Sequence, residues 1–194
     1  MSYQQKTIQL NIQNQNIFFT ADNHFSHTNI IKYCERPFPS VEGMNSSMIK
    51  NWNNKIKDTD IIFILGDFCW GSKKNWLYLF ERLNGHKYLT QGNHDKGIPS
   101  SGLVTASPIL NVNIKGDEEI AEGQRITCSH YPMLSWYQSH RGSWQLYGHV
   151  HGRFSGKGDT KTTPNQLDVG VDVHGFAPIS YEEIKTIITK RNLS

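Results

Sequence analysis

The chain of 194 residues carries a formal net charge of +3 at pH 7, and 37% of its residues are hydrophobic, including five Trp, nine Phe and eight Tyr. This composition excludes a disordered chain and predicts one globular domain, residues 1–194, with a substantial core. The mild positive charge suits an anionic substrate without indicating nucleic acid, and the longest apolar run, Ile61 to Leu65, is too short to span a membrane.

The first half of the chain predicts strands that alternate with helices. Apolar runs rich in β-branched residues mark the strands, and apolar residues at helical spacing mark the helices. The alternating order is typical of a parallel α/β unit. The predicted strands are 7–13, 17–21, 60–65 and 86–90, and the predicted helices lie within 25–34, 40–57 and 72–83.

The second half predicts a more mixed arrangement, without an internal repeat or a linker that would divide the domain. Two runs, 109–114 and 119–128, flank a polar turn and predict an antiparallel pair, the second broken near Gly123. The last helix begins with a capping box, Ser180 to Glu183, and continues to Lys190. Further predicted elements are loops at 96–107 and 156–163, a strand that ends in Leu146-Tyr147 and a strand at 167–173.

Side chains that bind metals follow the predicted strands at five points along the chain. The carboxyl ends of parallel strands are the usual place for ligands in an open α/β sheet, so we expect these side chains to converge. His149 and His151 would share one face if they lay on a strand, and Gly148 and Gly152 leave room beside a ligand. The full set is Asp22, His24, Asp67, Asn93, His130, His149 and His151.

This set of donors predicts a pair of metal ions. Carboxylate, amide oxygen and imidazole without a thiolate suit divalent Mn, Fe, Co, Ni or Zn, and disfavour a structural zinc site. Seven protein ligands are too many for one tetrahedral ion, and the carboxylate of Asp67 has two oxygens with which to bridge two. Ions ~3.5–4 Å apart can hold a hydroxide for in-line attack at phosphorus. His94 can transfer a proton near neutral pH, and Asp95 could orient its ring.

The same residues resemble a known family. The blocks Asp22-Asn23-His24, Gly66-Asp67, Gly92-Asn93-His94-Asp95, His130 and Gly148-His149-Val150-His151 resemble, in order, the five signature blocks of calcineurin-like metallophosphoesterases. The resemblance covers residues 18–152. It implies an α/β fold, a four-layer αββα sandwich of two mixed sheets, in a single compact domain. The spacing between the blocks is compact and leaves no room for a cap domain.

The resemblance also implies a role for each site residue. Asp22, His24, Asp67 and His151 would hold one ion, and Asp67, Asn93, His130 and His149 would hold the other. His94 would be the general acid that protonates the leaving oxygen, oriented by Asp95. The ions are expected to be two divalent metals, with Mn first and Fe, Zn, Ni or Co as the alternatives.

Local features narrow the resemblance to the small, stand-alone bacterial and phage phosphoesterases. These features are His27, the turn Arg36-Pro37-Phe38, Trp52-Asn53, the run 129–132 and the run 169–173. A cleft without a cap favours a substrate with a bulky second substituent. The expected function is therefore hydrolysis of phosphodiesters or nucleotide-type phosphate esters by attack of a metal-bridging hydroxide, with no covalent intermediate.

Several alternatives remain open at the level of sequence. The enzyme could be a phosphomonoesterase, including a protein phosphatase, or a nuclease, and the fold could serve as a non-catalytic interaction scaffold. Arg36 and His27 are candidate substrate-binding residues, although Arg36 could instead pair with Glu35 or Glu42. Tyr131 and Trp136 could form a stacking wall or simply pack.

Cellular location and partners are predicted only in outline. The three cysteines, Cys34, Cys69 and Cys128, are odd in number and form no CxxC motif, as expected of reduced thiols in a cytoplasmic protein. The first residues lack the apolar core of a signal peptide. The expected partner is a phosphate-ester substrate and not a membrane, and nothing in the sequence indicates the oligomeric state.

Overall fold

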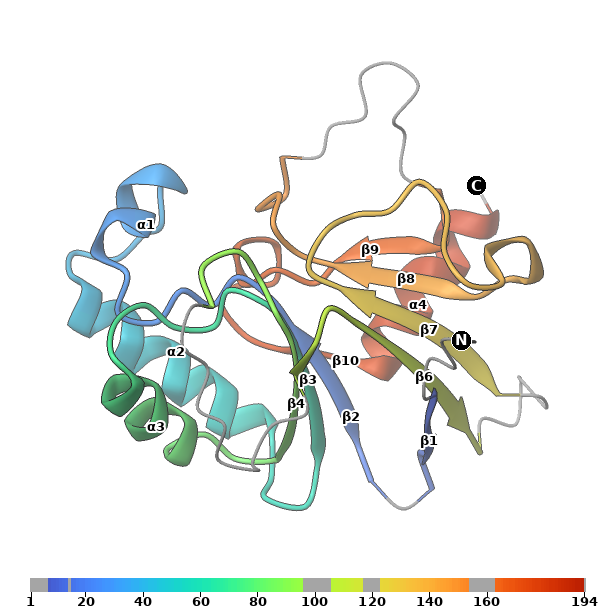
Figure 1. Cartoon of the computed structure of the whole chain (residues 1–194), viewed down its shortest axis with the longest axis horizontal. Helices are drawn as coiled ribbons and strands as arrows, with labels where there is room; N and C mark the ends of the chain where they lie inside the picture. The colour runs from blue at the N-terminus through green and yellow to red at the C-terminus, as the bar shows by residue number, and fades with distance from the viewer. Residues whose placement is uncertain (1–6, 14, 96–105, 117–122, 154–162, 194) are drawn as a thin grey trace, which may run out of the picture.

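The computed structural model describes residues 7–13, 15–95, 106–116, 123–153 and 163–193. Two five-stranded sheets lie against each other, with helices packed around them (Figure 1). The strands are β1 (Thr7–Asn11), β2 (Ile17–Thr20), β3 (Ile61–Leu65), β4 (His86–Thr90), β5 (Ala106–Ser107), β6 (Ile109–Lys115), β7 (Gln124–Ser129), β8 (Trp144–Tyr147), β9 (Gln166–Asp168) and β10 (Ile179–Ser180). The helices are α1 (Thr28–Tyr33), α2 (Val41–Lys55), α3 (Lys73–Glu81) and α4 (Tyr181–Leu193), with short 3-10 turns η1 (Ser139–Arg141) and η2 (Val171–Val173).

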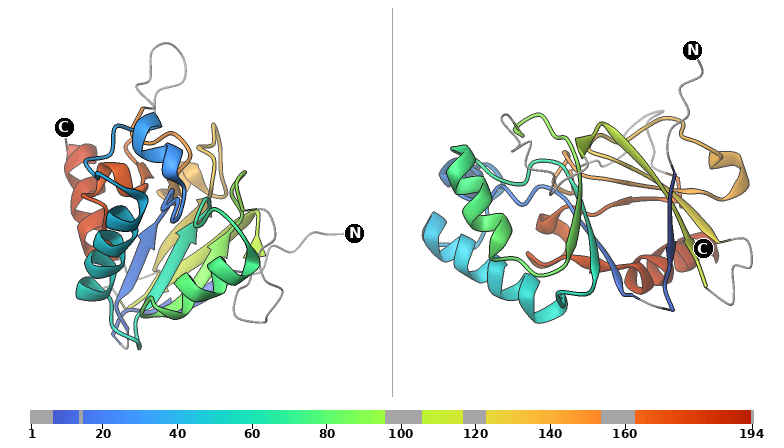
Figure 2. Two further views of the ribbon diagram at one scale, coloured as in Figure 1. Left: turned by 90° about the vertical axis from the view of Figure 1, so that its left-hand side faces the viewer. Right: turned by 60° about the horizontal axis from the view of Figure 1, so that its bottom comes forward.

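The first sheet has the order β10-β2-β3-β4-β5, and its strands are parallel except for β10. Its central strand β3 is buried on both faces, which explains its uniformly apolar sequence. Alternate residues face opposite ways: Ile62 and Ile64 pack with the helices, and Phe63 packs between the sheets. Helices α2 and α3 cover the outer face of this sheet, as the two views of Figure 2 show.

The second sheet has the order β1-β6-β7-β8-β9, and within it only β6 and β7 pair antiparallel, as predicted. Its apolar side chains, among them Val112 and Leu146, fill the space between the sheets. Helix α4 contacts β2 and β10 of the first sheet and β9 of the second, and it places Ile184 and Ile188 in the same core. The α/β sandwich of two mixed sheets in one compact domain is confirmed.

Two predicted helix starts are confirmed in detail. Ser40 caps α2, because its Oγ accepts the backbone N–H of Gly43 at 3.1 Å. At α4 the capping box is complete: Ser180 Oγ accepts the N–H of Glu183 at 3.2 Å, and Glu183 Oε2 accepts the N–H of Ser180 at 2.8 Å. Of the described helices, none combines the length and the apolar character that a membrane crossing requires.

Other predictions need correction. The strand predicted at 167–173 ends at Asp168, because Asp168 Oδ1 accepts the N–H of Gly170 at 2.8 Å and turns the chain into η2. β1 and β2 follow each other in sequence but belong to different sheets. The two-residue strand β10 is too short to leave a sequence pattern. Most of the loops predicted at 96–107 and 156–163, and the start of the strand predicted at 119–128, lie outside the described residues.

The strand ends that carry the polar blocks meet at one edge of the sandwich. Two backbone hydrogen bonds join the segments after β2 and β3: Asp22 N–H to Gly66 O at 3.1 Å, and His24 N–H to Asp67 O at 2.9 Å. A third joins the segments after β7 and β8, from Gly148 N–H to His130 O at 3.0 Å. Both sheets therefore contribute side chains to the same place.

Candidate metal centre

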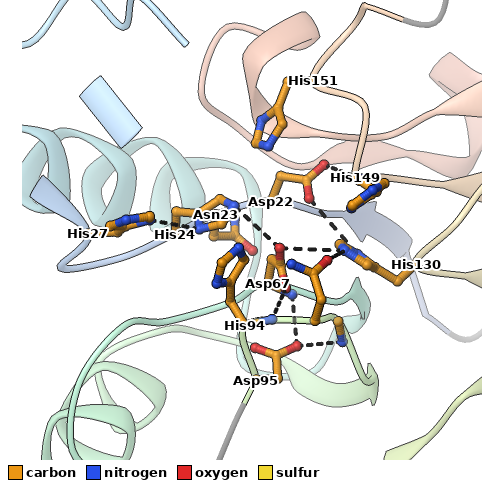
Figure 3. A network of polar contacts seen from close by, with 12 residues as sticks. Asp22, Asn23, His24, His27, Asp67, His94, Asp95, His130, His149 and His151 are labelled. Atoms are coloured by element: carbon orange, nitrogen blue, oxygen red, sulfur yellow. Dashed lines mark hydrogen bonds and ion pairs between the residues drawn. The ribbon is translucent and has the colours of Figure 1, made fainter. Parts of the chain in front are cut away.

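The predicted ligands converge around the carboxylate of Asp67. Its Oδ2 lies 3.5 Å from His24 Nε2 and 3.4 Å from His130 Nε2, between the two rings. Asn93 Oδ1 approaches the same nitrogen of His130 at 3.0 Å. Figure 3 shows the side chains of His149 and His151 facing this region from the loop after β8. The structure thus brings together side chains that are more than a hundred positions apart in the sequence.

Two overlapping groups made up only of the predicted ligands could each hold a cation. The first consists of Asp22, His24 and His151, and the second of Asp22, Asp67 and His130. Within each group, one ligand atom per residue lies within 4.8 Å of the others. The first group lies toward α1 and the second toward β7, with the carboxylates between them. This arrangement suits two neighbouring ions.

The backbone of this region is strained where the ligands are attached. His149 and His151 lie in the bends and turns that follow β8, outside every described helix and strand. The expectation of a shared strand face for these two histidines is therefore wrong. Non-glycine residues rarely adopt a positive φ, and such strain concentrates at functional sites. Five candidate ligands have φ between 48° and 72°: Asp22, His24, Asp67, His149 and His151.

The hydrogen bonding of His130 leaves an unfilled place for a cation. Its Nδ1 lies 2.9 Å from the carbonyl oxygen of Leu65 and must carry the proton to donate to it. Burial lowers the pKa of His130, but the carboxylate of Asp67 outweighs burial and raises it, so without a metal a proton on Nε2 can join the ring to Asp67. When that proton is lost, Nε2 presents a lone pair toward the oxygens of Asp67 and Asn93. Three acceptors that face one another without a shared proton repel unless a positive charge lies between them. The residues present therefore fit a divalent ion at this point.

The ligands on the other side of the centre, near His24, also lack a partner. His24 Nε2 and Asp22 Oδ1 are buried polar atoms without a hydrogen-bond partner, a state that costs free energy. Burial lowers the pKa of His24 to about 3 and raises the pKa of Asp22 to about 7. The His24 ring is thus neutral at pH 7 and able to ligate. A bound cation would supply the missing partner for both atoms.

Asp67 differs from Asp22 because it stays ionised. Burial raises its pKa, but the hydrogen bonds from His130 and from the backbone N–H of His94 outweigh burial and bring the pKa down to about 2. One oxygen, Oδ1, accepts the N–H of His94 at 2.8 Å. The other oxygen faces His24 and His130, which is the position a bridging ligand requires.

Two glycines of the polar blocks allow the segments to approach this closely. A Cβ on Gly148 would lie 2.7 Å from Asp22 Oδ2, and one on Gly92 would meet the backbone nitrogen of Asp67 at 2.5 Å. Both distances are shorter than packed atoms tolerate. The glycines are therefore needed for close approach between strand ends, and neither of them has a positive φ.

Asp95 does not orient His94, and this prediction is corrected. Its buried carboxylate accepts three backbone N–H groups, from Asp67 at 2.7 Å, from Phe68 at 3.0 Å and from Gly92 at 2.8 Å. Figure 3 shows Asp95 below the ligand cluster. Asp95 thus joins the turn after β3 to the turn after β4 and fixes the spacing between Asp67 and Asn93. Asp95 therefore holds the two turns together and does not orient the ring of His94.

His94 lies on the wall of a cavity that opens over the ligands. The cavity has a volume of about 450 Å³ and includes the side chains of Asp67, His149 and His151. The His94 ring is half-buried, with its centroid 5.5 Å from that of His24. Its backbone is held by Asp67, so the ring is placed relative to the ligands and also reaches the cavity. This is a suitable place for a proton donor.

His27 lines the same cavity, but its hydrogen bond points to a ligand. Its Nδ1 lies 3.2 Å from Nδ1 of His24, so one ring donates to the other. The bond fixes the orientation of His24 and directs its Nε2 toward Asp67. His27 is thus placed both to support a ligand and to contact a substrate.

Arg36 is not in the cavity, and the predicted substrate contact is replaced by a structural one. The residue is 4% exposed. Its guanidinium forms a two-point ion pair with Asp172, Nε to Oδ1 at 2.8 Å and Nη2 to Oδ2 at 2.9 Å. It also donates to the carbonyl oxygens of Asp22 at 2.7 Å and Asn23 at 3.0 Å. Neither Glu35 nor Glu42 is the partner.

Asp172 connects Arg36 to one of the candidate ligands, His151. Its Oδ2 accepts from His151 Nδ1 at 2.8 Å, which leaves Nε2 of that ring free for a cation. The nearby carboxylate of Asp168 accepts the N–H of Gly152 at 2.9 Å and so holds the same loop. No sequence signal identified Arg36 as the partner.

Replacing Arg36 by methionine should destabilise the metal-free protein. The change leaves Oδ1 of Asp172 without its guanidinium partner, and the carbonyl oxygens of Asp22 and Asn23 without their donor. Breaking one partner of a buried ion pair costs about 3–5 kcal/mol of unfolding free energy. Chemical denaturation in the presence of a chelator measures this loss. Arg82→Met, at an exposed position, is the control and should change stability little. Unchanged stability with a raised KM would restore Arg36 as a substrate contact.

The two aromatic residues considered as a stacking wall differ in their exposure. Tyr131 is half-exposed beside the centre, with its ring 4.5 Å from that of His149. Trp136 is buried and donates to the carbonyl of Ser143 at 3.1 Å, so it packs and does not form a wall for substrate. Three further basic residues from the second half of the chain, His140, Arg141 and His174, do not line the cavity over the ligands.

The chain is similar to several known proteins. The family model described as calcineurin-like phosphoesterase matches residues 16–153. An uncharacterized protein of Methanocaldococcus jannaschii is 33% identical over 177 residues, which cover 90% of this chain and 92% of the relative. The gene 66 protein of Mycobacterium phage D29 is 25% identical over 198 residues, covering 89% and 96%.

A solved structure agrees with these matches. The crystal structure of a protein of unknown function from Aquifex aeolicus superposes with a TM-score of 0.68 at 27% identity, covering 90% of this chain and all of that one. The family match spans the segment that carries the ligand cluster, from the start of β2 to the loop after β8. The chain therefore belongs to the calcineurin-like phosphoesterase family.

Proposed function

We propose that the chain is a dimetal-dependent phosphoesterase that hydrolyses phosphodiesters or nucleotide-type phosphate esters, with His94 as the general acid. One observation carries the proposal: lone pairs of buried ligands face one another around Asp67, at the floor of a cavity that His94 lines. Family membership supports the reaction class, a metal-dependent hydrolysis of phosphoric esters. The oxygen and imidazole donors favour Mn, with Fe, Zn, Ni or Co as alternatives.

The ligands would divide between two ions that share Asp67. When bound, the two divalent ions lower the pKa of water toward neutrality and neutralise charge on the phosphoryl oxygens. The chain's own contribution is to fix the ligands: His27 orients His24, and Asp172 orients His151. One ion would be held by Asp22, His24, Asp67 and His151, and the other by Asp67, Asn93, His130 and His149.

His94 supplies the proton for the leaving oxygen. Its backbone N–H is anchored on Asp67 Oδ1, so its ring keeps a fixed place relative to the bridging carboxylate. A phosphate ester bound at the ligands would then present its leaving oxygen to the imidazole. General acids of this kind matter most when the leaving group is a poor one.

The shape of the cavity supports a diester. Beyond the ligands the cavity continues between Asn29, Tyr33, Trp70 and Arg153. This extension offers room and contacts for a substituent larger than the phosphoryl group. A monoester of a small alcohol would leave that part of the cavity filled with water.

A chromogenic assay tests the proposal. With added Mn, we expect hydrolysis of bis-p-nitrophenyl phosphate at a higher kcat/KM than that of p-nitrophenyl phosphate, and no turnover of either ester with a chelator present. A higher value for the monoester would favour the alternative phosphomonoesterase, including a protein phosphatase. Failure to hydrolyse either ester would contradict the enzymatic proposal for simple esters.

The non-catalytic scaffold is the alternative of a different kind. A scaffold has no need to keep unpartnered buried acceptors, whereas this chain keeps them at Asp22 and His24. Metal analysis of the purified protein separates the two proposals. Binding of Mn or Zn at micromolar concentrations favours the enzyme, and a centre that stays empty favours the scaffold.

A further inference from the structure

A large aromatic ring stands open at the cavity beside His94. Trp70 follows β3 and precedes α3, and 45% of its surface is exposed. Its ring centroid lies 5.3 Å from that of His94. Tryptophan is usually highly buried, and a half-exposed indole on the wall of a cavity is a typical anchor for a ligand.

The position of Trp70 is fixed before any ligand arrives. Its ring stacks on that of His27, with centroids 4.5 Å apart and planes inclined by 12°. Its backbone N–H donates to Phe25 O at 2.8 Å, and its carbonyl oxygen accepts from Asn75 Nδ2 at 2.9 Å. Binding to a surface that is already ordered loses little conformational entropy.

The stack also connects the ring to the metal centre. His27 is buried and shares a hydrogen bond with His24, whose ring lies 5.4 Å from that of His151. Figure 3 shows His27, His24 and His94 grouped on one side of Asp67. Trp70 is therefore held at a constant place relative to both the ligands and the proposed acid.

A second exposed ring borders the same part of the cavity. Tyr33, at the end of α1, is 59% exposed, and its ring meets that of His27 edge-on at 6.4 Å. The backbone of Tyr33 is tied to the far side of the site, because its carbonyl oxygen accepts from Arg153 Nη2 at 2.6 Å. The extension of the cavity thus has aromatic surface next to His94 and a cationic group at its rim.

We propose that Trp70 is a stacking surface for a planar aromatic leaving group, so that the preferred substrates are phosphate esters of aromatic alcohols or of nucleosides. The inference rests on the proposed function, because His94 protonates the leaving oxygen and the group beyond that oxygen lies nearest to Trp70. A ring that stacks on an indole gains affinity regardless of its exact substituents. Trp70 would thus select flat groups without distinguishing one aromatic group from another.

Binding of phosphate monoesters with and without a flat group to the full-length, Mn-loaded protein tests this proposal. AMP and ribose 5-phosphate share the phosphate and the sugar but differ in the aromatic base. We expect AMP to bind about tenfold more tightly than ribose 5-phosphate in isothermal titration calorimetry. A second comparison, of phenyl phosphate with methyl phosphate, uses a ring without a sugar. It distinguishes a preference for esters of aromatic alcohols from a preference for esters of nucleosides.

Variants assign the difference to the indole. Trp70→Leu should abolish the preference for AMP and leave ribose 5-phosphate affinity unchanged, and Trp70→Phe should keep most of the preference. Tyr78→Leu is the matched control, because Tyr78 is 55% exposed on α3 and lies outside the cavity lining. It should change neither affinity.

Three results would overturn the proposal. Equal affinity for AMP and ribose 5-phosphate in the unmodified protein would remove the stacking surface, as would equal weakening of both ligands in Trp70→Leu. Absence of binding by either ligand would also overturn it, because the ring is proposed to act on esters anchored by their phosphate. Hydrolysis assays run in parallel keep the two proposals apart: turnover without a preference for AMP contradicts this inference alone, and a preference without turnover contradicts only the proposed function.

Discussion

Asp67→Asn should remove stable metal binding while preserving the fold. The asparagine keeps Oδ1 for the N–H of His94, but its amide replaces the carboxylate oxygen that faces both His24 and His130. Both ions would lose the shared negative ligand. We expect the affinity for Mn to fall by more than the roughly 100-fold limit for residues that only position a ligand. Titration calorimetry gives the affinity, and plasma mass spectrometry gives the metal content per chain.

Asp58→Asn is the matched control for this substitution, because Asp58 is an exposed carboxylate away from the site. It should bind metal like the unmodified chain, and both variants should retain cooperative unfolding. If Asp67→Asn bound two ions as tightly as the unmodified protein, Asp67 would not be the bridging ligand.

Removal of the His94 ring should, in contrast, leave metal binding intact and reduce turnover. His94→Ala keeps the backbone N–H that Asp67 accepts, so both ions should remain bound. For an ester with a poor leaving group, kcat should fall by about 10²–10⁴-fold, the usual contribution of general acid catalysis. With p-nitrophenol, which leaves readily without a proton, the loss should be much smaller.

The leaving-group series is what makes this result specific. A group that merely shapes the cavity would slow all esters equally, so a uniform loss in His94→Ala would contradict the acid role. His140→Ala, an exposed histidine on η1, is the control and should leave every rate unchanged. Metal content measured on the same samples excludes an indirect effect through the ligands.

The positions of the ligands were predictable because each one follows a predicted strand. The uniformly apolar run of β3 could only be a central strand, and its end necessarily placed Asp67 at the sheet edge. The donor types then limited the chemistry to divalent ions. The two-sheet architecture itself was expected only from the family resemblance.

The supporting contacts could not be predicted, because they join residues that no local pattern connects. Arg36 and Asp172 are 136 positions apart, and their ion pair exists only after both sheets have assembled. Asp95 stands beside His94 in the sequence, yet its carboxylate turns toward the backbone of Asp67 and Phe68 instead. The positive φ values of Asp22 and His151 are likewise properties of the folded chain.

One measurement tests the proposed metal centre most directly: anomalous scattering from a crystal of the Mn-loaded protein, recorded at the Mn absorption edge. The proposed centre predicts two peaks ~3.5–4 Å apart, one on each side of Asp67 Oδ2. The peak beside His24 and the peak beside His130 should both disappear when the crystal is soaked in chelator. A single peak, or peaks away from Asp67, would contradict the dimetal centre.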